Sequence, residues 1–396
     1  MTPDKTARCF TAPGRVEIGG NHTDHQHGRV LAAAINLKTT AAVKANDYGV
    51  ARIDDAVFGR EEVDLGSLDI REGEKGKPAA IVRGVAAWFI QHGYPVGGFD
   101  AIISSDVPFG AGLSSSAAFE VLIGNIFKGL YPVSTSASGS EGVCCSATGS
   151  ICPGISRMEI AIAGQYAENV YFGKPCGLMD QTASSFGGLN AIDFADPINP
   201  QVVPVQADLA GYMLCIVNTG GSHADLTPDY AAIPGEMKAV AAHFGYTYLR
   251  EVPPDVFYSS VESLRYLGDR AVLRAFHFFG ENERVLKQSA ALGRNDIAEF
   301  LSLINESGRS SLAYLQNVYS PAGPRSQGLT LALAMTEKKL KSKGACRVHG
   351  GGFAGTILAF VPEEIKTGYD AYMSGVFGDG CCHFLSISSE GGGEAT

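Results

Sequence analysis

The sequence predicts a two-domain chain of the α/β class (α+β type). The chain has 396 residues, and since domains commonly span about 100–200 residues, we expect two. Hydrophobic residues make up 45% and charged residues 18%, a balance that suits large buried cores and not a disordered chain. Strand-like and helix-like segments mix up to about residue 190, and helical patterns then dominate, which predicts domains at residues 1–200 and 201–396.

The clearest elements of the first half surround residue 110. Residues 99–107 (FDAIISSDV) are rich in β-branched side chains and predict a strand. Residues 114–130 carry apolar side chains at helical spacing, and residues 155–172 predict another helix that ends at Gly173 and Pro175. The segment between these helices, 134–154, is small, polar and rich in breakers, so we expect an exposed loop.

The second half begins with strands and continues with helices. Residues 190–218 suggest a run of strands, the clearest at 212–218 (YMLCIVN). Helical patterns cover residues 228–244, 269–291, 294–307 and 326–343. Two further strands, 345–349 and 356–361, flank a glycine loop, and the tail at 391–396 (GGGEAT) is expected to be disordered.

Charge and cysteine usage restrict the partners and the compartment. The net charge of −10 makes nucleic acid an unexpected partner, although backbone amides can still bind small phosphates. The sequence contains no apolar run of about 18 residues and no apolar signal segment at its start, so a membrane partner is not expected. Nine cysteines, an odd number without a C-x-x-C pair, indicate a cytoplasmic protein with reduced thiols.

A glycine-rich turn at 108–118 (PFGAGLSSSAA) joins the predicted strand to the helix. Unpaired amides at a helix N-terminus, together with the helix dipole, favour a di- or triphosphate. The alternative is a helix capped by Ser114 without any ligand. The P-loop motif G-x-x-x-x-G-K-[ST] is absent, and the G-x-G-x-x-G of Gly350, Gly352 and Gly355 precedes a strand, so a glycine hairpin closing over a ligand, or a plain turn, fits better.

Two other segments concentrate polar chemistry. His22, Asp24, His25 and His27 lie within the glycine-rich loop predicted at 13–28 (PGRVEIGGNHTDHQHG). They suggest a metal site, contacts to a polyhydroxy ligand or a solvated loop, but no second cluster of metal ligands is evident. In the segment 167–188, Glu168 lies late in a helix and a second carboxylate follows twelve residues later in CGLMDQ. One could bind Mg²⁺ and the other act as a base, or both could be ordinary surface acids.

In this order, the segments resemble the galactokinase branch of the GHMP kinase superfamily. The resemblance rests on PGRVEIGGNHTDH, PFGAGLSSSAA, CGLMDQ and VHGGGFAG, with RAFHFFGENERV (274–285) and HADLTPDY (223–230) as further similar segments. It implies two α/β domains with the active site in the cleft between them. It also implies ATP as co-substrate and Mg²⁺ as cofactor.

The resemblance implies roles for individual residues. Asp180 matches the catalytic base that takes the proton from the anomeric hydroxyl, and Arg15 matches the arginine that pairs with it. Ser116 and Glu168 match the Mg²⁺ ligands. The residues implied to hold the triphosphate are Gly110, Gly112, Leu113, Ser114, Ser115 and Ser116. Those implied to lie at the sugar are Asn21, His22, Asp24, Gly177 and Tyr230.

One position departs from the family pattern. The family commonly has glutamate before the histidine of G-E-H-x-D, where it contacts the C6 hydroxyl of the sugar, but this chain has Asn21. Asparagine is neutral and shorter, so it either binds the same hydroxyl with a different geometry or signals an amino sugar or a pentose. His25 also stands where tyrosine is common.

We therefore expect an ATP-dependent sugar 1-kinase that acts on galactose. Three alternatives remain: a kinase for an amino sugar or a pentose, a non-catalytic galactose/ATP sensor, and a metal-dependent hydrolase built on the histidine-rich segment.

Overall fold

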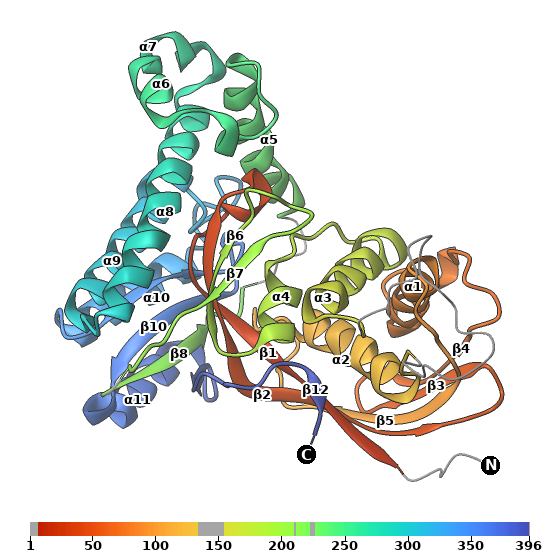
Figure 1. Cartoon of the computed structure of the whole chain (residues 1–396). Helices are drawn as coiled ribbons and strands as arrows, with labels where there is room; N and C mark the ends of the chain where they lie inside the picture. Colours follow the sequence, from red (N-terminus) through yellow and green to blue (C-terminus); the bar gives the residue numbers. More distant parts are fainter. Residues whose placement is uncertain (1–6, 134–153, 210, 222–225, 396) are drawn as a thin grey trace.

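The computed structural model describes residues 7–133, 154–209, 211–221 and 226–395. Most of the loop expected at 134–154, and residues 223–225 of HADLTPDY, lie outside these ranges. Two sheets with helices packed against them form the body of the molecule, and a helical lobe that contains α6 and α7 projects from it (Figure 1).

The first sheet has eight strands in the order β12-β1-β2-β5-β3-β4, and β6 joins it through β2 and carries β7. A long antiparallel pair, β1 and β2, forms its centre, while β3 and β5 are parallel. Its strands are β1 (Arg8–Gly19), β2 (Arg29–Ala45), β3 (Val50–Asp55), β4 (Gly59–Asp64), β5 (Phe99–Ser105), β6 (Leu189–Asp193), β7 (Gln201–Pro204) and β12 (Gly393–Glu394).

Helices α1 to α4 pack together beside this sheet (Figure 1). They are α1 (Pro78–Gln91), α2 (Ser115–Leu130), α3 (Arg157–Tyr166) and α4 (Met179–Phe186), and a π-helical turn (Ala167–Phe172) continues α3. The apolar face of α2, with Val121, Leu122 and Ile126 fully buried, packs on β1 and β2 because these side chains recur at helical spacing. The starts of α2 and α4 both lie beside Arg15 of β1, through the contacts of Arg15 with Leu113 and Asp180.

The second sheet is antiparallel, in the order β11-β8-β10-β9. Its strands are β8 (Tyr212–Asn218), β9 (Ala345–His349), β10 (Thr356–Pro362) and β11 (Cys382–Leu385). The helices of this half are α5 (Thr227–His243), α6 (Pro254–Ser259), α7 (Val261–Leu264), α8 (Asp269–Gly293), α9 (Ile297–Ser310), α10 (Gly328–Leu340) and α11 (Lys366–Phe377). The predicted glycine hairpin is confirmed, since β9 and β10 pair with His349 opposite Thr356.

Two sequence-based predictions are wrong. The tail is ordered: Gly393 and Glu394 pair with β1, and the Glu394 carboxylate binds Arg8 at 2.5 Å. The glycine-rich sequence of the tail could not predict this, because the tail is ordered by pairing with a strand that is far away in the sequence. The glycine-rich loop expected at 13–28 is a strand as far as Gly19, and only its second half turns. Because β12 belongs to the first sheet, the chain returns to its N-terminal half at its end; the domain limits at 200 and 201 stay a prediction.

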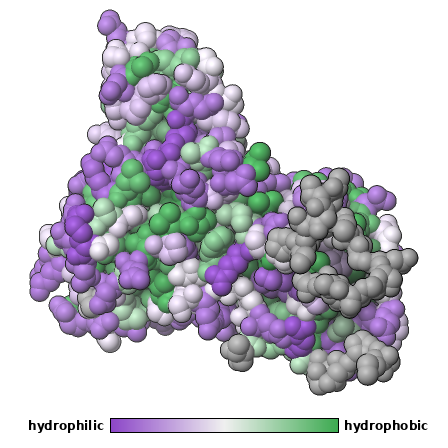
Figure 2. Space-filling view, viewed as in Figure 1, coloured by the Kyte–Doolittle hydropathy of each residue, from purple (hydrophilic) through white to green (hydrophobic). Residues whose placement is uncertain are grey.

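The face seen in Figure 2 carries apolar residues on its central part, below the projecting lobe, with hydrophilic residues around them. Over the described ranges, each helix is too short or too polar to cross a membrane.

Candidate active site

Asp180 and Arg15 form the centre of the site. Asp180 lies in the first turn of α4 and Arg15 on β1. The guanidinium binds the carboxylate with both arms, Nε to Oδ1 at 2.7 Å and Nη2 to Oδ2 at 2.6 Å, and its Nη1 donates to the carbonyl of Gly112 at 2.6 Å. Such a planar two-armed pair fixes orientation as well as charge. The predicted pairing of Asp180 and Arg15 therefore exists in the fold, and Arg15 also contacts the predicted phosphate loop at Gly112.

Ser114 connects this pair to the predicted phosphate loop. Its hydroxyl donates to Asp180 Oδ2 and makes no cap bond to α2. Its backbone is left-handed, with φ of 57°, a strained conformation that clusters at functional sites. The simple reading of Ser114 as a helix cap is therefore wrong, and the first-turn amides of α2 lack the side-chain cap that a Ser114 hydroxyl would otherwise supply.

The electrostatics keep Asp180 ionised. Burial raises the pKa of the carboxyl, but the charge of Arg15 and the hydrogen bonds from Arg15 and Ser114 outweigh it, so the pKa lies below its usual value. The side chain is 29% exposed, against 8% for Arg15. A carboxylate that is anchored on one side and open on the other can receive a proton from a bound hydroxyl.

Asp180 faces a polar cavity of about 720 Å³, hereafter the sugar cavity. Its wall contains the proposed sugar contacts Asn21, His22, Asp24, Gly177 and Tyr230, together with Arg15 and Glu17. The glycine at 177 is required here, because a Cβ at this position would lie 2.2 Å from Asp24 Oδ2. Burial, and then the nearby Asp180 charge, raise the pKa of Asp24 to about 6.

The histidines of the turn bind one another and the glycine hairpin. His22 Nε2 donates to the carbonyl of Gly351 at 2.9 Å, and His22 Nδ1 lies 3.2 Å from His25 Nε2. Burial lowers the pKa of both rings, so they are neutral, with His25 as the donor to His22. His27 instead stacks on Tyr248. Across the described ranges, no three or more acidic, histidine or cysteine side chains gather as they would around a metal ion.

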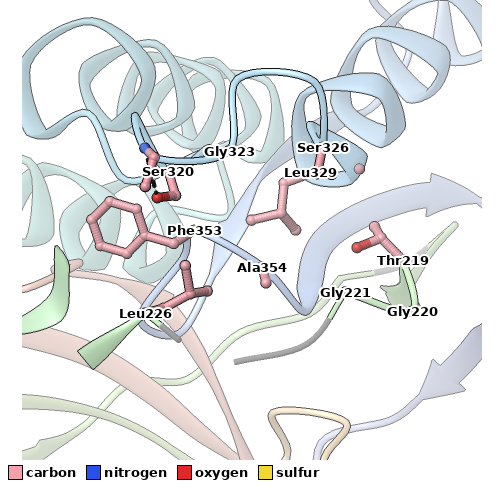
Figure 3. Close-up of a pocket in the computed structure, with 12 residues that line it drawn as sticks. Thr219, Gly220, Gly221, Leu226, Ser320, Gly323, Ser326, Leu329, Phe353 and Ala354 are labelled. Carbon is pink, nitrogen blue, oxygen red and sulfur yellow. Dashed lines mark hydrogen bonds between the residues drawn. The ribbon is translucent and has the colours of Figure 1, made fainter. Parts of the chain in front are cut away.

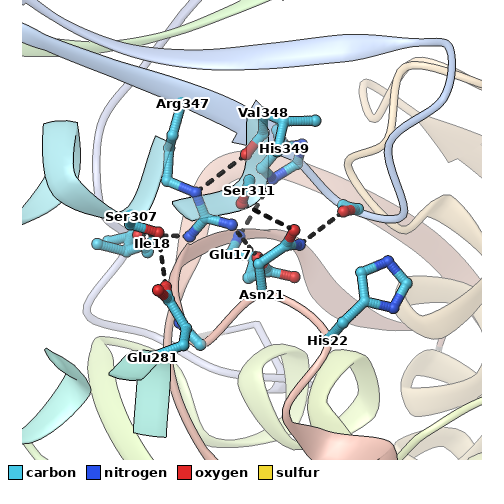
Figure 4. A network of polar contacts seen from close by, with 12 residues as sticks. Glu17, Ile18, Asn21, His22, Glu281, Ser307, Ser311, Arg347, Val348 and His349 are labelled. Carbon is cyan, nitrogen blue, oxygen red and sulfur yellow. Dashed lines mark hydrogen bonds and ion pairs between the residues drawn. The ribbon is translucent and has the colours of Figure 1, made fainter. Parts of the chain in front are cut away.

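Asn21 is 1% exposed and its amide is fully engaged by protein (Figure 4). Its Nδ2 donates to Glu17 Oε1 at 2.9 Å and to the carbonyl of Gly350 at 2.7 Å. Its Oδ1 accepts from Asn317 Nδ2 at 2.9 Å and from Ser311 Oγ at 3.4 Å. An amide has two donors and two acceptor sites, so Asn21 keeps none for a ligand. The expected direct contact between Asn21 and a sugar hydroxyl is therefore not available in this arrangement.

Tyr230 ties the glycine hairpin to the opposite wall of the sugar cavity. Its hydroxyl donates to the carbonyl of Gly352 at 2.8 Å, and burial raises the pKa of the phenol to about 12. The tyrosine therefore stays neutral, and because its one proton is donated to Gly352, its oxygen can only accept a hydrogen bond from a ligand.

An apolar cavity of about 260 Å³, hereafter the nucleotide cavity, lies beside Ser115 and Ser116, the residues that follow Ser114. Ser115 and Ser116, in the first turn of α2, line one part of it, and four aromatic rings are among its other lining residues: Phe58, Phe109, Phe119 and Phe172. Phe58 and Phe109 contact each other edge to face, yet Phe109 is 76% exposed. Exposed apolar rings beside free helix amides suit a flat base joined to phosphates. These aromatic residues were missed, because no motif identifies them.

The predicted metal ligand Glu168 is buried beside a second glutamate, Glu120. Its carboxylate accepts from Lys174 Nζ at 3.1 Å and from Gln181 Nε2 at 3.2 Å. Gln181 Nε2 also donates to Glu120 Oε2 at 2.8 Å, and burial followed by the Glu168 charge raises the pKa of Glu120 well above its usual value. Glu120 was missed, although its place four residues after Ser116 puts both on one face of α2.

A magnesium ion fits this group. Among the described residues, the buried Oε1 atoms of Glu120 and Gln181 have no hydrogen-bond partner. Carboxylate, amide and hydroxyl oxygens are the ligands that Mg²⁺ prefers, together with substrate phosphates.

A further cavity, of about 410 Å³, lies beside the glycine hairpin and is shown in Figure 3. Small, hydroxyl and apolar residues line it, including Thr219, Ser320, Leu329 and Phe353, and its described lining contains no ionisable side chain. None of the predicted site residues borders it in the described ranges, so it is separate from the sugar cavity and the nucleotide cavity.

Comparison with known proteins agrees with this geometry. Residues 3–45 match the galactokinase galactose-binding signature, and residues 80–188 match the GHMP kinases N terminal domain. The galactokinase of Glaesserella parasuis serovar 5 (strain SH0165) is 32% identical over 365 residues, which cover 89% of this chain and 85% of that protein. The chain belongs to the galactokinase family. A galactokinase of Actinobacillus pleuropneumoniae is 32% identical over 361 residues, 90% of this chain and 86% of that protein.

Solved structures agree on the fold. The Lactococcus lactis galactokinase complexed with galactose superposes with a TM-score of 0.80 at 23% identity, covering 98% of this chain and 95% of that one. A mevalonate kinase superposes with a TM-score of 0.65 at 15% identity, covering 96% and 99%. The mixed α/β fold of GHMP kinase type is thus confirmed, as is the family resemblance found in the sequence.

Proposed function

We propose that this galactokinase family member is an ATP-dependent sugar 1-kinase that phosphorylates galactose at its anomeric hydroxyl. The observation that carries the proposal is the place of Asp180. Its carboxylate forms part of the wall of the sugar cavity and accepts a hydrogen bond from Ser114, whose neighbours Ser115 and Ser116 line the nucleotide cavity. A reacting hydroxyl and a terminal phosphate can therefore meet beside one base.

The hydrogen bonds of Asp180 leave room for that hydroxyl. A carboxylate offers about four acceptor sites, and protein groups use three: one on Oδ1, from Arg15, and two on Oδ2, from Arg15 and Ser114. The anomeric hydroxyl would donate to the remaining site on Oδ1. As its oxygen bonds to the γ-phosphorus and the bond to the β-phosphate oxygen breaks, the proton passes to Asp180. Arg15 stabilises the negative charge near the attacking oxygen.

The phosphates would rest on the loop amides and on the first turn of α2. The loop residues Gly110 and Gly112 have left-handed backbones, and Leu113, whose side chain is buried in the core, can offer only its amide. Mg²⁺ would be held by Ser116 and Glu168, with Glu120 close to Glu168, and it neutralises charge on the transferred phosphoryl group when bound.

Sugar-dependent ADP release tests the proposal. Purified protein with ATP, Mg²⁺ and galactose should release ADP, and phosphorus NMR should show one equivalent of galactose 1-phosphate. Galactose replaced by methyl galactoside, which has no free anomeric hydroxyl, should give only background release. If ATP and galactose bind but no sugar phosphate forms, the protein is the sensor considered above. We also propose a cytoplasmic location and no nucleic acid partner, in line with the acidic net charge of −10.

A further inference from the structure

Glu17 is a carboxylate in the sugar cavity that no sequence motif assigned. It lies on β1 two residues after Arg15, and because side chains alternate along a strand, both point to the same side. It forms part of the cavity wall together with Arg15, Asn21 and Asp24. Its residue is only 4% exposed, so the access it has is to this cavity.

The two oxygens of Glu17 differ in their contacts. Oε1 accepts from Arg347 Nη2 at 2.5 Å and from Asn21 Nδ2 at 2.9 Å (Figure 4). Oε2 accepts no hydrogen bond from any described residue. It is also not one of the fully buried side-chain atoms without a partner, so this oxygen is accessible. Oε2 is therefore an acceptor at the cavity surface, on a side chain that is held in place from behind.

The surrounding residues hold this acceptor rigidly in place. Arg347 is fully buried, and its other nitrogens donate to the carbonyls of Val348 and Ile18, at 3.0 and 2.9 Å, so it cannot turn away from Glu17. Asn21 is held by Gly350 and Asn317. A carboxylate held in this way accepts a hydrogen bond from a hydroxyl more strongly than a neutral group does.

We propose that Glu17, and not Asn21, recognises the sugar, by accepting a hydrogen bond from the hydroxyl at the end of the pyranose remote from the anomeric carbon. The inference rests on the proposed kinase function. Two residues along a strand correspond to about 7 Å, roughly the span of a pyranose with its exocyclic group, and Arg15 fixes Asp180 at the anomeric end.

This assignment narrows the substrate class. A carboxylate acceptor favours a neutral hexose with a primary hydroxyl at C6. It disfavours a uronic acid, whose own carboxylate would meet Glu17, and a 6-deoxy sugar or a pentose, which would leave Oε2 unpaired.

The test compares galactose with 6-deoxygalactose, using kcat/KM for each sugar at saturating ATP. Wild type should prefer galactose by about 100-fold or more, because a buried carboxylate left unpaired disfavours the analogue. Glu17→Gln should lower this preference to about tenfold or less, mainly through the KM for galactose. Since the preference is a ratio within one preparation, the fraction of folded protein does not affect it.

Glu74→Gln is the matched control, since Glu74 also pairs with a fully buried arginine, Arg83, at 2.8 Å but does not line the sugar cavity. It should lower the melting temperature and leave the galactose preference unchanged. An unchanged preference in Glu17→Gln would overturn the inference about Glu17 alone. No phosphorylation of galactose by wild type would instead overturn the proposed function.

Discussion

The sugar cavity and the nucleotide cavity are built in opposite ways. The nucleotide cavity is apolar, and its described lining comes only from the N-terminal half of the chain: β2, the β3–β4 turn, the start of α1, the β5–α2 segment and Phe172. The sugar cavity is polar and combines β1, the turn after it, α4, α5 and the glycine hairpin. Its key side chains are held by residues that do not touch the cavity, such as Asn317 and Arg347. We infer that substitutions on the nucleotide side act locally, whereas substitutions on the sugar side spread through a hydrogen-bond network.

The Arg15–Asp180 pair lines the sugar cavity and is hydrogen-bonded to Ser114, which directly precedes the serines of the nucleotide cavity, so its loss should have the largest effect. Arg15→Lys keeps the charge but loses the two-armed contact and the bond to Gly112, so kcat should fall about 100- to 1000-fold. Steady-state kinetics with both substrates saturating measure this. Arg8→Lys, at an exposed ion pair on the same strand, should change kcat little. Similar kcat values for Arg15→Lys and Arg8→Lys would contradict a special role of the Arg15–Asp180 pair in catalysis.

Gly177→Ala should act on the sugar side alone. The added methyl group would overlap Asp24 Oδ2, and Asp24 would have to move. We expect the KM for galactose to rise about 10- to 100-fold while the dissociation constant of ATP stays the same. Gly280→Ala, on the open face of α8, is the control. If the affinity for ATP falls together with the affinity for galactose, the two cavities do not bind their substrates independently.

Phe109→Ala tests the nucleotide side in the same way. The ring is exposed in the structure and would be covered by a bound base, so the KM for ATP should rise about five- to tenfold. The KM for galactose should not change. Tyr266→Ala removes an equally exposed ring from the projecting lobe and should leave both constants as they are. Equal effects of the two substitutions would remove Phe109 from the nucleotide site.

Asp24→Asn should have the smallest of these effects, and it should stabilise the folded protein. The folded protein raises the pKa of Asp24 from 3.8 to about 6, so ionised Asp24 opposes folding above pH 6 and ceases to do so below about pH 4. The variant should therefore melt at a higher temperature than wild type at pH 7, with the gap closing toward pH 4, while the KM for galactose rises. A variant that melts below wild type at pH 7 would contradict this electrostatic account.

Local patterns predicted much of this fold. Residues 212–218 and 345–349 are strands with the expected limits, and the helix at Ser115–Leu130 begins one residue from its predicted start. Strand pairing between distant segments could not be predicted in this way, as β12 on β1 shows. The helix of Asp180, at Met179–Phe186, is too short to produce a clear periodic pattern.

The site shows the same division. The family resemblance implied the Arg15–Asp180 pair, which the structure contains, but not the hydrogen bond from Ser114 to Asp180. The motifs could not show that four protein groups occupy Asn21, because Asn317 and Ser311 follow almost 300 residues later. The role of Glu17 emerges only when its two oxygens are compared in three dimensions.

The central claim is that Asp180, in the wall of the sugar cavity and hydrogen-bonded to Ser114, accepts the proton of the reacting hydroxyl. Asp180→Asn removes the base but keeps the shape, so the most direct measurement is a single turnover with galactose and ATP both prebound. Galactose 1-phosphate formation should slow by about 1000-fold or more, while calorimetry still shows ATP binding close to that of wild type. A single-turnover rate close to that of wild type would contradict the account.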